Sequence, residues 1–190
     1  NKMNEDFKIL KSEIVSGKYV NLRIASEADA AFILELRLNP LLNKFIGTTD
    51  PSLEKQQQWI KKSFENANDF HFIIEDKDAV PCGTVAVYNI NFNDSSAEWG
   101  RWVIKPNTPV FISIESTILI LYFAFRKLKL KRLYGGANKL NAQVIKYHKL
   151  YADVTSEDET TINFDFAERN LKKLADKFKN FHNLQNELNI

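Results

Sequence analysis

Hydrophobic and polar residues follow two repeating patterns along this chain, and the switches between them predict where strands and helices lie. Residues 19–24 alternate apolar and polar side chains, which is the period of a strand with one buried face. Later runs are rich in aromatic and β-branched residues or show the same alternation. The expected strands are residues 19–24, 70–75, 83–90, 97–104, 132–136 and 161–166.

Apolar residues at helical spacing mark the segments between these strands. Ser26 and Asp29 are typical of a capped helix start, and Asn39-Pro40 ends that helix because the residue before a proline disfavours helical backbone. Residues 112–128 are too apolar for a helix that lies on the surface. The expected helices are residues 27–38, 50–66, 112–128, 141–149 and 167–179.

The order of these elements predicts the fold class. One strand and two helices come first, and the next three strands are joined by short turns that indicate an antiparallel meander. Helices and strands alternate in the rest of the chain. We therefore expect an α/β (α+β) fold with a mixed, mostly antiparallel sheet flanked by helices. Residues 1–16 are expected to be an N-terminal extension, 17–166 the domain, and 167–190 a C-terminal helix.

Composition narrows the possible classes of function. The 190 residues are 44% hydrophobic and 26% charged, which fits one globular domain and excludes a wholly disordered chain. A net charge of +2 is small for a protein that binds duplex nucleic acid. Residues 116–125 are too short a run to span a membrane, and residues 1–12 lack the apolar core of a signal peptide. Cys82 is the single cysteine, so we expect a cytoplasmic protein without an internal disulfide.

Short motifs occur in order along the predicted elements. They are Leu22-Arg23 with Asp29-Ala30, Leu36-Arg37-x-Asn39-Pro40, Gln56-x-x-Trp59-Ile60, Cys82-Gly83-Thr84-Val85, Ala97-Glu98-Trp99-Gly100-x-Trp102-Val103-Ile104 and Asn141-x-x-Val144-Ile145-Lys146-x-His148. Over residues 19–166 this series resembles the GNAT superfamily of acyl-CoA-dependent N-acyltransferases. It is most similar to the branch that acylates ribosomal-protein N-termini and nucleotide-linked amino sugars. The resemblance implies an N-acetyltransferase that moves an acetyl group from acetyl-CoA, or another acyl group from its CoA thioester, to a primary amine.

This reaction needs a group that takes a proton from the amine and a group that protonates the leaving thiolate. The resemblance implies Glu98 as the base, acting directly or through a water molecule. It implies His148 as the acid, with Tyr147 as the neighbour that can substitute for it. A solvent-facing or ion-paired Glu98 and a locally hydrogen-bonded His148 are the alternatives.

The resemblance also assigns residues to the acyl-CoA. The strand backbone at Val103 and Ile104 is expected to pair with the pantetheine arm, and Asn141 is expected either to lie near that arm or to cap its helix. The pyrophosphate is expected to face the start of the long helix. The residues concerned are Ile112, Ser113 and Ile114.

The chain departs from the family pattern at this helix start. Most GNAT members have a glycine-rich loop there, whose bare amides hold the pyrophosphate. This sequence has no glycine between Gly100 and Gly135. We expect Phe111 to bring bulk, and Glu115 negative charge, toward the phosphates.

The acceptor implied by the resemblance is a nucleotide-linked amino sugar of bacterial surface-polysaccharide synthesis. Trp59, Trp102 and His71 are the candidate contacts, because sugar faces stack on aromatic rings; core packing is the alternative for all three. An Arg- or Lys-lined pocket would favour this acceptor, since it carries a diphosphate. An acidic pocket would favour a cationic acceptor and hence a protein N-terminal acetyltransferase.

A second alternative is a GNAT-shaped binding module without catalysis, which the missing glycines motivate. No spacing typical of metal ligands occurs, and no metal, nucleic acid or membrane partner is expected. The sequence leaves the oligomeric state open, and a homodimer through an exposed sheet edge is one possibility.

Overall fold

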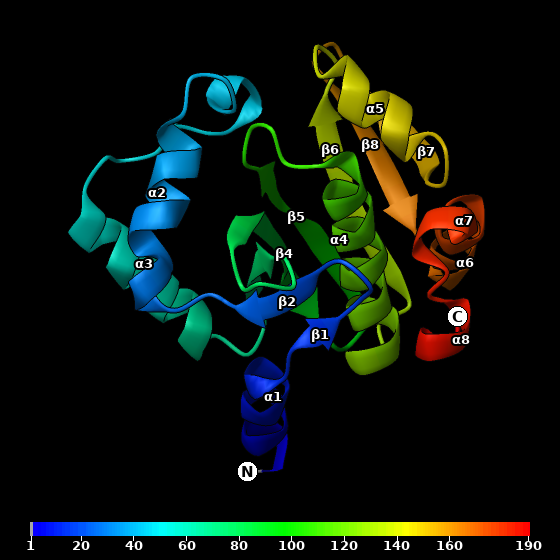
Figure 1. Cartoon of the computed structure of the whole chain (residues 1–190), viewed down its shortest axis with the longest axis horizontal. Coiled ribbons are helices and arrows are strands. Elements are labelled where there is room, and N and C mark those ends of the chain that lie inside the picture. The colour runs from blue at the N-terminus through cyan, green and yellow to red at the C-terminus, as the bar shows by residue number, and fades with distance from the viewer. Residues whose placement is uncertain (1) are drawn as a thin grey trace.

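An eight-stranded sheet forms the centre of the computed structural model, which describes residues 2–190 (Figure 1). The strands lie in the order β1-β2-β3-β4-β5-β6-β8-β7, and all neighbours are antiparallel except β5 and β6. They are β1 (Val15–Ser16), β2 (Asn21–Ile24), β3 (Phe70–Glu75), β4 (Pro81–Asn91), β5 (Ser96–Ile104), β6 (Arg132–Asn138), β7 (Asp153–Glu157) and β8 (Thr161–Phe166). The mixed, mostly antiparallel sheet expected from the sequence is confirmed.

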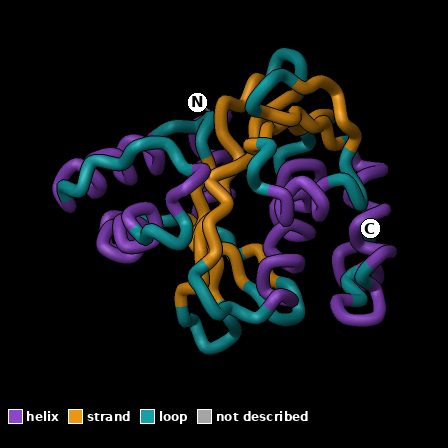
Figure 2. The backbone as a smooth tube through the Cα atoms, turned by 90° about the horizontal axis from the view of Figure 1, so that it is seen from above, coloured by secondary structure: helices purple, strands orange, loops and turns teal. Residues whose placement is uncertain are grey.

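Helices cover both faces of this sheet (Figure 2). On one face α2 and α3 enclose a small core with Ile33, Ile60 and Ile73, and on the other face α4 lies in the main core. The helices are α1 (Lys2–Ser12), α2 (Ala30–Leu38), α3 (Leu53–Glu65), α4 (Val110–Tyr122), α5 (Ala142–His148), α6 (Glu168–Lys177), α7 (Lys179–His182) and α8 (Gln185–Leu188). None of the helices within residues 2–190 is both long and apolar enough to cross a membrane.

The predicted helices agree with the structure to within a few residues, apart from details at their ends. The first one begins as a 3-10 turn at Glu27–Asp29 and continues as α2. Arg23 donates two hydrogen bonds of 2.8 Å to the Asp29 carboxylate, and these bonds fix the capped start. The predicted helix 112–128 is α4 followed by a π-helical turn at Phe123–Lys127.

Some segments differ from the sequence prediction. The sequence does not predict β7, because its five residues are mostly exposed on the outer edge of the sheet and show no apolar alternation. The expected extension 1–16 contains α1 and β1, and the expected single C-terminal helix is divided into α6, α7 and α8. Since β7 is an edge strand, a homodimer through this edge stays a prediction.

Lys11 fastens α1 to the rest of the domain. Its buried ammonium group donates to the carbonyl oxygens of Ser63, Phe64 and Asn66 at 2.9, 2.7 and 2.8 Å. These carbonyls lie at the C-terminal end of α3, where helices leave their last acceptors unpaired and favour positive charge. The N-terminal segment is therefore part of the packed structure.

The feature that positions the site is a split between β5 and β6. These parallel strands pair only at Ser96 with Arg132, Ala97 with Leu133 and Glu98 with Tyr134, and then they diverge (Figure 1). On its other side β5 bulges against β4, where Arg101 adopts a positive φ of 48°. The Thr84 hydroxyl donates to the Arg101 carbonyl at 2.7 Å and stabilises this bulge.

Candidate active site

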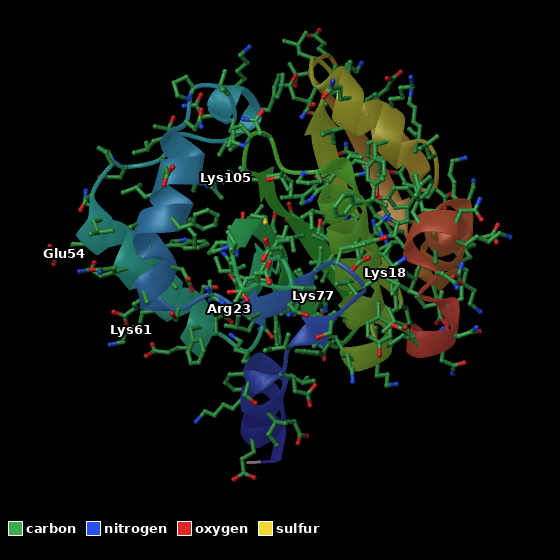
Figure 3. All side chains as sticks on the ribbon, viewed as in Figure 1. Lys18, Arg23, Glu54, Lys61, Lys77 and Lys105 are labelled. Atoms are coloured by element: carbon green, nitrogen blue, oxygen red, sulfur yellow. The ribbon has the colours of Figure 1, made fainter. Side chains whose placement is uncertain are left out.

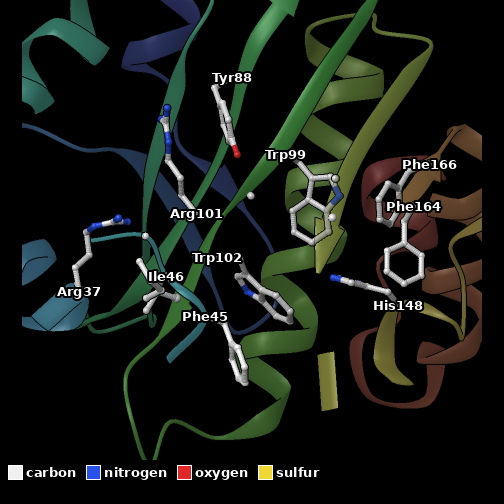
Figure 4. A pocket seen from close by; sticks show the side chains of 15 residues that line it. Arg37, Phe45, Ile46, Tyr88, Trp99, Arg101, Trp102, His148, Phe164 and Phe166 are labelled. Carbon is white, nitrogen blue, oxygen red and sulfur yellow. The ribbon is translucent and has the colours of Figure 1, made fainter. Parts of the chain in front are cut away.

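A cavity of about 330 Å³ opens in the split between the two strands. Figure 4 shows the side chains that surround it. They come from β4, β5, β6, β8, α2, α5 and the loop after α2, and they include Arg37, Phe45, Tyr88, Trp99, Arg101, Trp102, Val103, His148, Phe164 and Phe166. Separate parts of the chain meet at this space, which we call the transfer cavity.

His148 lies at the end of α5 and points one ring nitrogen toward the space between Trp99 and Trp102 (Figure 4). Its other nitrogen, Nδ1, is 3.1 Å from the Tyr151 hydroxyl. Burial lowers the pKa of the imidazole to about 4, so the ring is neutral near pH 7. A neutral ring hydrogen-bonds well but is a weak acid, and the acid role expected for His148 stays a prediction.

Tyr147 precedes His148 on α5 but faces a different neighbour. Its hydroxyl contacts the Thr117 hydroxyl on α4, and Tyr147 does not line the transfer cavity. Burial raises the pKa of the phenol, which keeps it protonated. Tyr147 therefore carries a proton, but its hydroxyl faces α4 and not the transfer cavity. Its role as a substitute acid stays a prediction.

Glu98 lies on β5, directly across from Tyr88 of β4. The Tyr88 hydroxyl donates to Glu98 Oε1 at 3.1 Å, and Asn89 Nδ2 donates to Oε2 at 3.1 Å. Tyr88 lines the cavity and Glu98 does not. A Cβ at Gly100 would lie 2.8 Å from the Tyr88 hydroxyl, so this hydroxyl needs glycine beside it. The base role predicted for Glu98 thus requires a proton to pass through Tyr88 or water.

The residues expected at the pantetheine arm lie along the same split. Val103 lines the transfer cavity, and Ile104 pairs with Gly83 of β4. A Cβ at Gly83 would meet the Val103 carbonyl at 2.4 Å, which explains the glycine of that motif. Asn141 occupies the N-cap position of α5, but its side chain makes no capping hydrogen bond. Pairing with an acyl-CoA remains a prediction for these residues.

Two faces of α4 have different neighbours. Phe111 and Glu115 are four residues apart and therefore share one face, which lies against the β1–β2 region. The Phe111 ring packs on Tyr19 with centroids 4.7 Å apart. The opposite side carries Ser116, whose hydroxyl accepts from Trp102 Nε1 at 3.1 Å. Ser113, three residues before Ser116, also belongs to this side.

Glu115 turns into the core and is fully buried, so the carboxylate does not face outward from the helix start as the sequence predicts. Its side chain is 0% exposed and accepts hydrogen bonds from the backbone amides of Tyr19 and Val20 at 2.6 and 3.0 Å. Its second oxygen is 2.7 Å from His182 Nδ1 of α7. A Cβ at Gly17 would lie 2.2 Å from Glu115 Oε1, and glycine is required for this close approach.

Replacement of Glu115 by Gln is expected to lower the free energy of unfolding by about 1–2 kcal/mol. Glutamine keeps the acceptor for the two amides but replaces the carboxylate oxygen that contacts His182 Nδ1 with an uncharged amide group, which weakens that contact. Urea denaturation measures the change. An unchanged midpoint and slope would contradict the structural role of Glu115.

A second cavity of about 340 Å³ adjoins the transfer cavity under α2 and α3. Arg37 and Arg101 line both cavities. The second cavity also contains Thr48, Thr49, Asp50, Lys55, Gln56, Trp59 and His71. We call it the side cavity. It brings together Trp59 and His71, two of the three predicted acceptor contacts, whereas Trp102 lies in the transfer cavity.

The two arginines differ in their partners. Arg101 forms an ion pair with Asp69 at 2.8 Å and lies over the rings of Trp59 and Tyr88, with centroid distances of 4.7 and 4.0 Å. Arg37 uses Nε to donate to the Thr49 hydroxyl at 2.9 Å and pairs with no carboxylate among the described residues. Burial and the charge of Arg101 lower the pKa of Arg37, although arginine remains protonated. Arg37 is therefore a positive charge available to an anion.

His71 on β3 is a buried polar group without a partner. It is 4% exposed, and neither ring nitrogen has a hydrogen-bond partner within residues 2–190. Its ring meets the Trp59 ring edge-on at 5.2 Å. Burial, together with the charges of Arg101 and Arg37, lowers the pKa of His71 to about 3. His71 is therefore a neutral ring at physiological pH.

His71→Phe is expected to leave stability at pH 7 unchanged or to raise it, because the variant removes two unpaired buried nitrogens. Below pH 6.5 the unfolded wild type takes up a proton at this position, whereas the folded form stays neutral down to about pH 3. The wild type thus loses about 3 kcal/mol at pH 4.5 that the variant retains. Urea denaturation of the wild type and the variant at pH 7 and pH 4.5 tests this prediction. A variant that is less stable than the wild type at pH 4.5 would contradict it.

The sequence prediction missed several residues of the two cavities. Arg37 and Gln56 lie within the quoted motifs without an assigned role, and Tyr88 and Arg101 were not singled out as cavity residues. The sequence carries little information about these residues. The spacing of apolar residues indicates which face of a helix or strand is buried, but it does not reveal the cross-strand register that places Tyr88 opposite Glu98. Within residues 2–190, the His, Cys, Asp and Glu side chains form no cluster of three that could hold a metal ion.

Comparisons with known proteins agree with this geometry. A family model described as Acetyltransferase (GNAT) domain matches residues 20–150. The solved apo structure of FdhC, described as a nucleotide-linked sugar GNAT, is 28% identical with a TM-score of 0.79, covering 90% of this chain and 98% of FdhC. No curated protein gives a significant match.

Two further solved structures share the fold. A GCN5-related N-acetyltransferase from Brucella melitensis is 14% identical with a TM-score of 0.73, covering 89% of this chain and 85% of that one. A variant of the spermidine N-acetyltransferase SpeG from Vibrio cholerae is 17% identical with a TM-score of 0.68, covering 80% of this chain and 95% of that one. Because the family model spans well over half of the sequence, the chain belongs to the GNAT acetyltransferase family and is an N-acetyltransferase.

Proposed function

We propose that this enzyme transfers the acetyl group of acetyl-CoA to the primary amine of a nucleotide-linked amino sugar. The observation that carries this proposal is the position of Arg37, a half-buried cation between the two cavities with no carboxylate partner in the described part of the chain. An arginine in this position binds phosphate oxygens well, because its guanidinium presents several donors in one plane. The similarity to FdhC supports the same acceptor class.

The charge of the site argues against cationic acceptors. Polyamines and protein N-termini carry a positive charge that Arg37 would repel at close range. The carboxylates nearby are already engaged: Asp69 pairs with Arg101, and Asp50 pairs with Lys55. The similarity to spermidine acetyltransferases lies below 20% identity and supports the fold alone. We therefore place a protein N-terminal acetyltransferase second.

The acyl-CoA has a suitable binding region in the split between β5 and β6. The pantetheine arm would lie along Val103 and Ile104, where β5 has no partner strand on the β6 side. The pyrophosphate would lie at the first turn of α4, where the amides of a helix start have no acceptor four residues back. The Ile112 amide already donates to the Pro109 carbonyl at 3.0 Å, so the neighbouring amides would make the contact. Because the Phe111 ring packs on Tyr19 and Glu115 is buried, neither side chain obstructs this site in the way that the sequence indicates.

The reaction would join the two substrates in the transfer cavity. The amine nitrogen attacks the thioester carbon, and the sulfur leaves with the electron pair of the broken bond. We propose that the amine proton passes to the Tyr88 oxygen while the Tyr88 hydroxyl proton passes to Glu98 Oε1, 3.1 Å away. His148 and Trp102 would hold the reacting groups in place. The thiolate would take its proton from water, because the Tyr147 hydroxyl contacts Thr117 and does not line the cavity.

A place in the synthesis of a bacterial surface polysaccharide is part of the proposal, because such pathways use N-acylated sugars on nucleoside diphosphates. The remaining alternative is a binding module that has lost acyl transfer. Calorimetric titration with acetyl-CoA separates it from an enzyme. Binding near 1 µM, about −8 kcal/mol, is expected, together with thiol release that depends on a nucleotide-linked amino sugar. Binding without acceptor-dependent thiol release would remove the proposed function.

A further inference from the structure

We propose that the side cavity is the subsite for the nucleoside of the acceptor, and that His71 and Gln56 are its hydrogen-bonding residues. The inference rests on the proposed function, since it assigns a part of that acceptor to a cavity beside the one where transfer occurs. Figure 3 shows the side chains whose placement the structure describes, and Figure 4 shows Arg37 and Arg101 at the transfer cavity. Both arginines also line the side cavity.

His71 provides the first argument. A fully buried imidazole with two unpaired nitrogens is costly, and native structures rarely retain such a group without a reason. The neutral ring has one donor and one acceptor nitrogen. Because His71 lines the side cavity, a ligand there can pair with one of the two nitrogens, which point in different directions from the ring. A nucleobase and the diol of a ribose both carry donors and acceptors suited to this contact.

Gln56 provides a second, separate observation. It is buried on α3 and lines the same cavity, and its side-chain amide makes no hydrogen bond to the described residues. The amide supplies donors and an acceptor, as the imidazole does. Thr48 and Thr49 add hydroxyl groups from the loop before α3. The side cavity is therefore lined in part by neutral side chains that can donate and accept hydrogen bonds.

The charged residues of the side cavity indicate which part of the acceptor it binds. Arg101 is neutralised by Asp69, and Lys55 is neutralised by Asp50. Of the two arginines that line both cavities, Arg37 is the one without a carboxylate partner among residues 2–190. A single unpaired arginine between the cavities suits a diphosphate that passes from one to the other. The uncharged nucleoside then occupies the side cavity, and the amino sugar enters the transfer cavity. The order transfer cavity, Arg37, side cavity matches the order sugar, diphosphate, nucleoside in the ligand.

Trp59 supplies a flat apolar surface for this ligand. Trp59 is 39% exposed and lines the side cavity, while Arg101 and His71 contact its ring. Aromatic surface next to neutral donors and acceptors is the combination that binds planar heterocycles. A site for a second phosphate would require more free cations than the side cavity contains.

Calorimetry with three probes tests the subsite: UDP, dTDP and inorganic pyrophosphate, each with saturating coenzyme A so that the donor site is filled. His71→Phe and Gln56→Leu are each expected to weaken binding of the better nucleoside diphosphate at least tenfold and to change pyrophosphate affinity less than twofold. Arg37→Gln is expected to weaken all three probes. Lys61→Gln, at an exposed lysine of α3 that lines neither cavity, is the control and is expected to change none.

Two results would overturn the subsite. One is equal nucleoside diphosphate affinity in the wild type and in both cavity variants; the other is wild-type binding of pyrophosphate as strong as that of either nucleotide. If the wild type still acetylates a nucleotide-linked amino sugar in these cases, the proposed function stands and the subsite alone fails. If the wild type neither binds the nucleotides nor acetylates the sugar, both proposals fail.

Discussion

Replacement of Glu98 by Gln is expected to lower kcat by about 10²–10³-fold and to leave the affinity for acetyl-CoA within twofold. Glutamine keeps the shape of the side chain and an oxygen that can accept from Asn89, whereas its amide nitrogen would donate to the Tyr88 oxygen and cannot take up a proton. General-base catalysis contributes about 10²–10⁴-fold to enzymatic rates, which sets the expected size. The measurement is steady-state thiol release at saturating acceptor.

Tyr88→Phe separates a relay from direct proton transfer. If protons pass through the phenol, this variant is expected to lose activity to a similar extent, and the double variant is expected to lose little more than either single one. Stability measured on the same samples controls for loss of the fold. Full activity in the Glu98→Gln variant would rule out Glu98 as the base, whichever acceptor is used.

Arg37→Gln is expected to lower kcat/KM for a nucleotide-linked amino sugar roughly 100-fold, with most of the change in KM. A hydrogen bond to a charged group contributes about 1.5–3 kcal/mol, and about 1.4 kcal/mol corresponds to a factor of ten. For a primary amine without phosphate, the expected change is less than threefold. This difference distinguishes recognition of the diphosphate from general damage to the site.

Arg169→Gln is a matched control for that experiment. Arg169 lies on α6, pairs with Asp153 near the surface and lines neither cavity. Its replacement is expected to leave both acceptors unaffected. Equal losses for the charged and uncharged acceptors in Arg37→Gln would show that Arg37 supports the fold or the acyl-CoA site instead of binding phosphate.

The sheet was predictable from local pattern because each predicted strand has a distinct face or a buried run. β3, for example, is buried at every position, and its aromatic and β-branched residues indicate a strand without knowledge of its partners. β7 was not predictable for the opposite reason, since an exposed edge strand is stabilised by pairing with β8 and not by a hydrophobic pattern of its own. The split between β5 and β6 depends on register, which no local pattern reveals.

The candidate site was predictable only in part. Family motifs indicated Glu98, His148 and Trp102, and the structure places the last two in the transfer cavity. The environment of Glu115 was not predictable, because its partners Tyr19 and His182 are far away in the sequence. Spacing alone placed this carboxylate near the phosphates, whereas its helix face turns it into the core. The role of such a charged residue therefore depends on contacts with residues far away in the sequence, which its local sequence does not reveal.

The most direct test of the account is a one-pot competition in which acetyl-CoA, a nucleotide-linked amino sugar, spermidine and a peptide with a free N-terminus are present together. Mass spectrometry of the products gives the ratios of kcat/KM without separate assays. We expect the nucleotide-linked sugar to be acetylated at least 100-fold more efficiently than either cation. Preferential acetylation of spermidine or of the peptide would contradict the account.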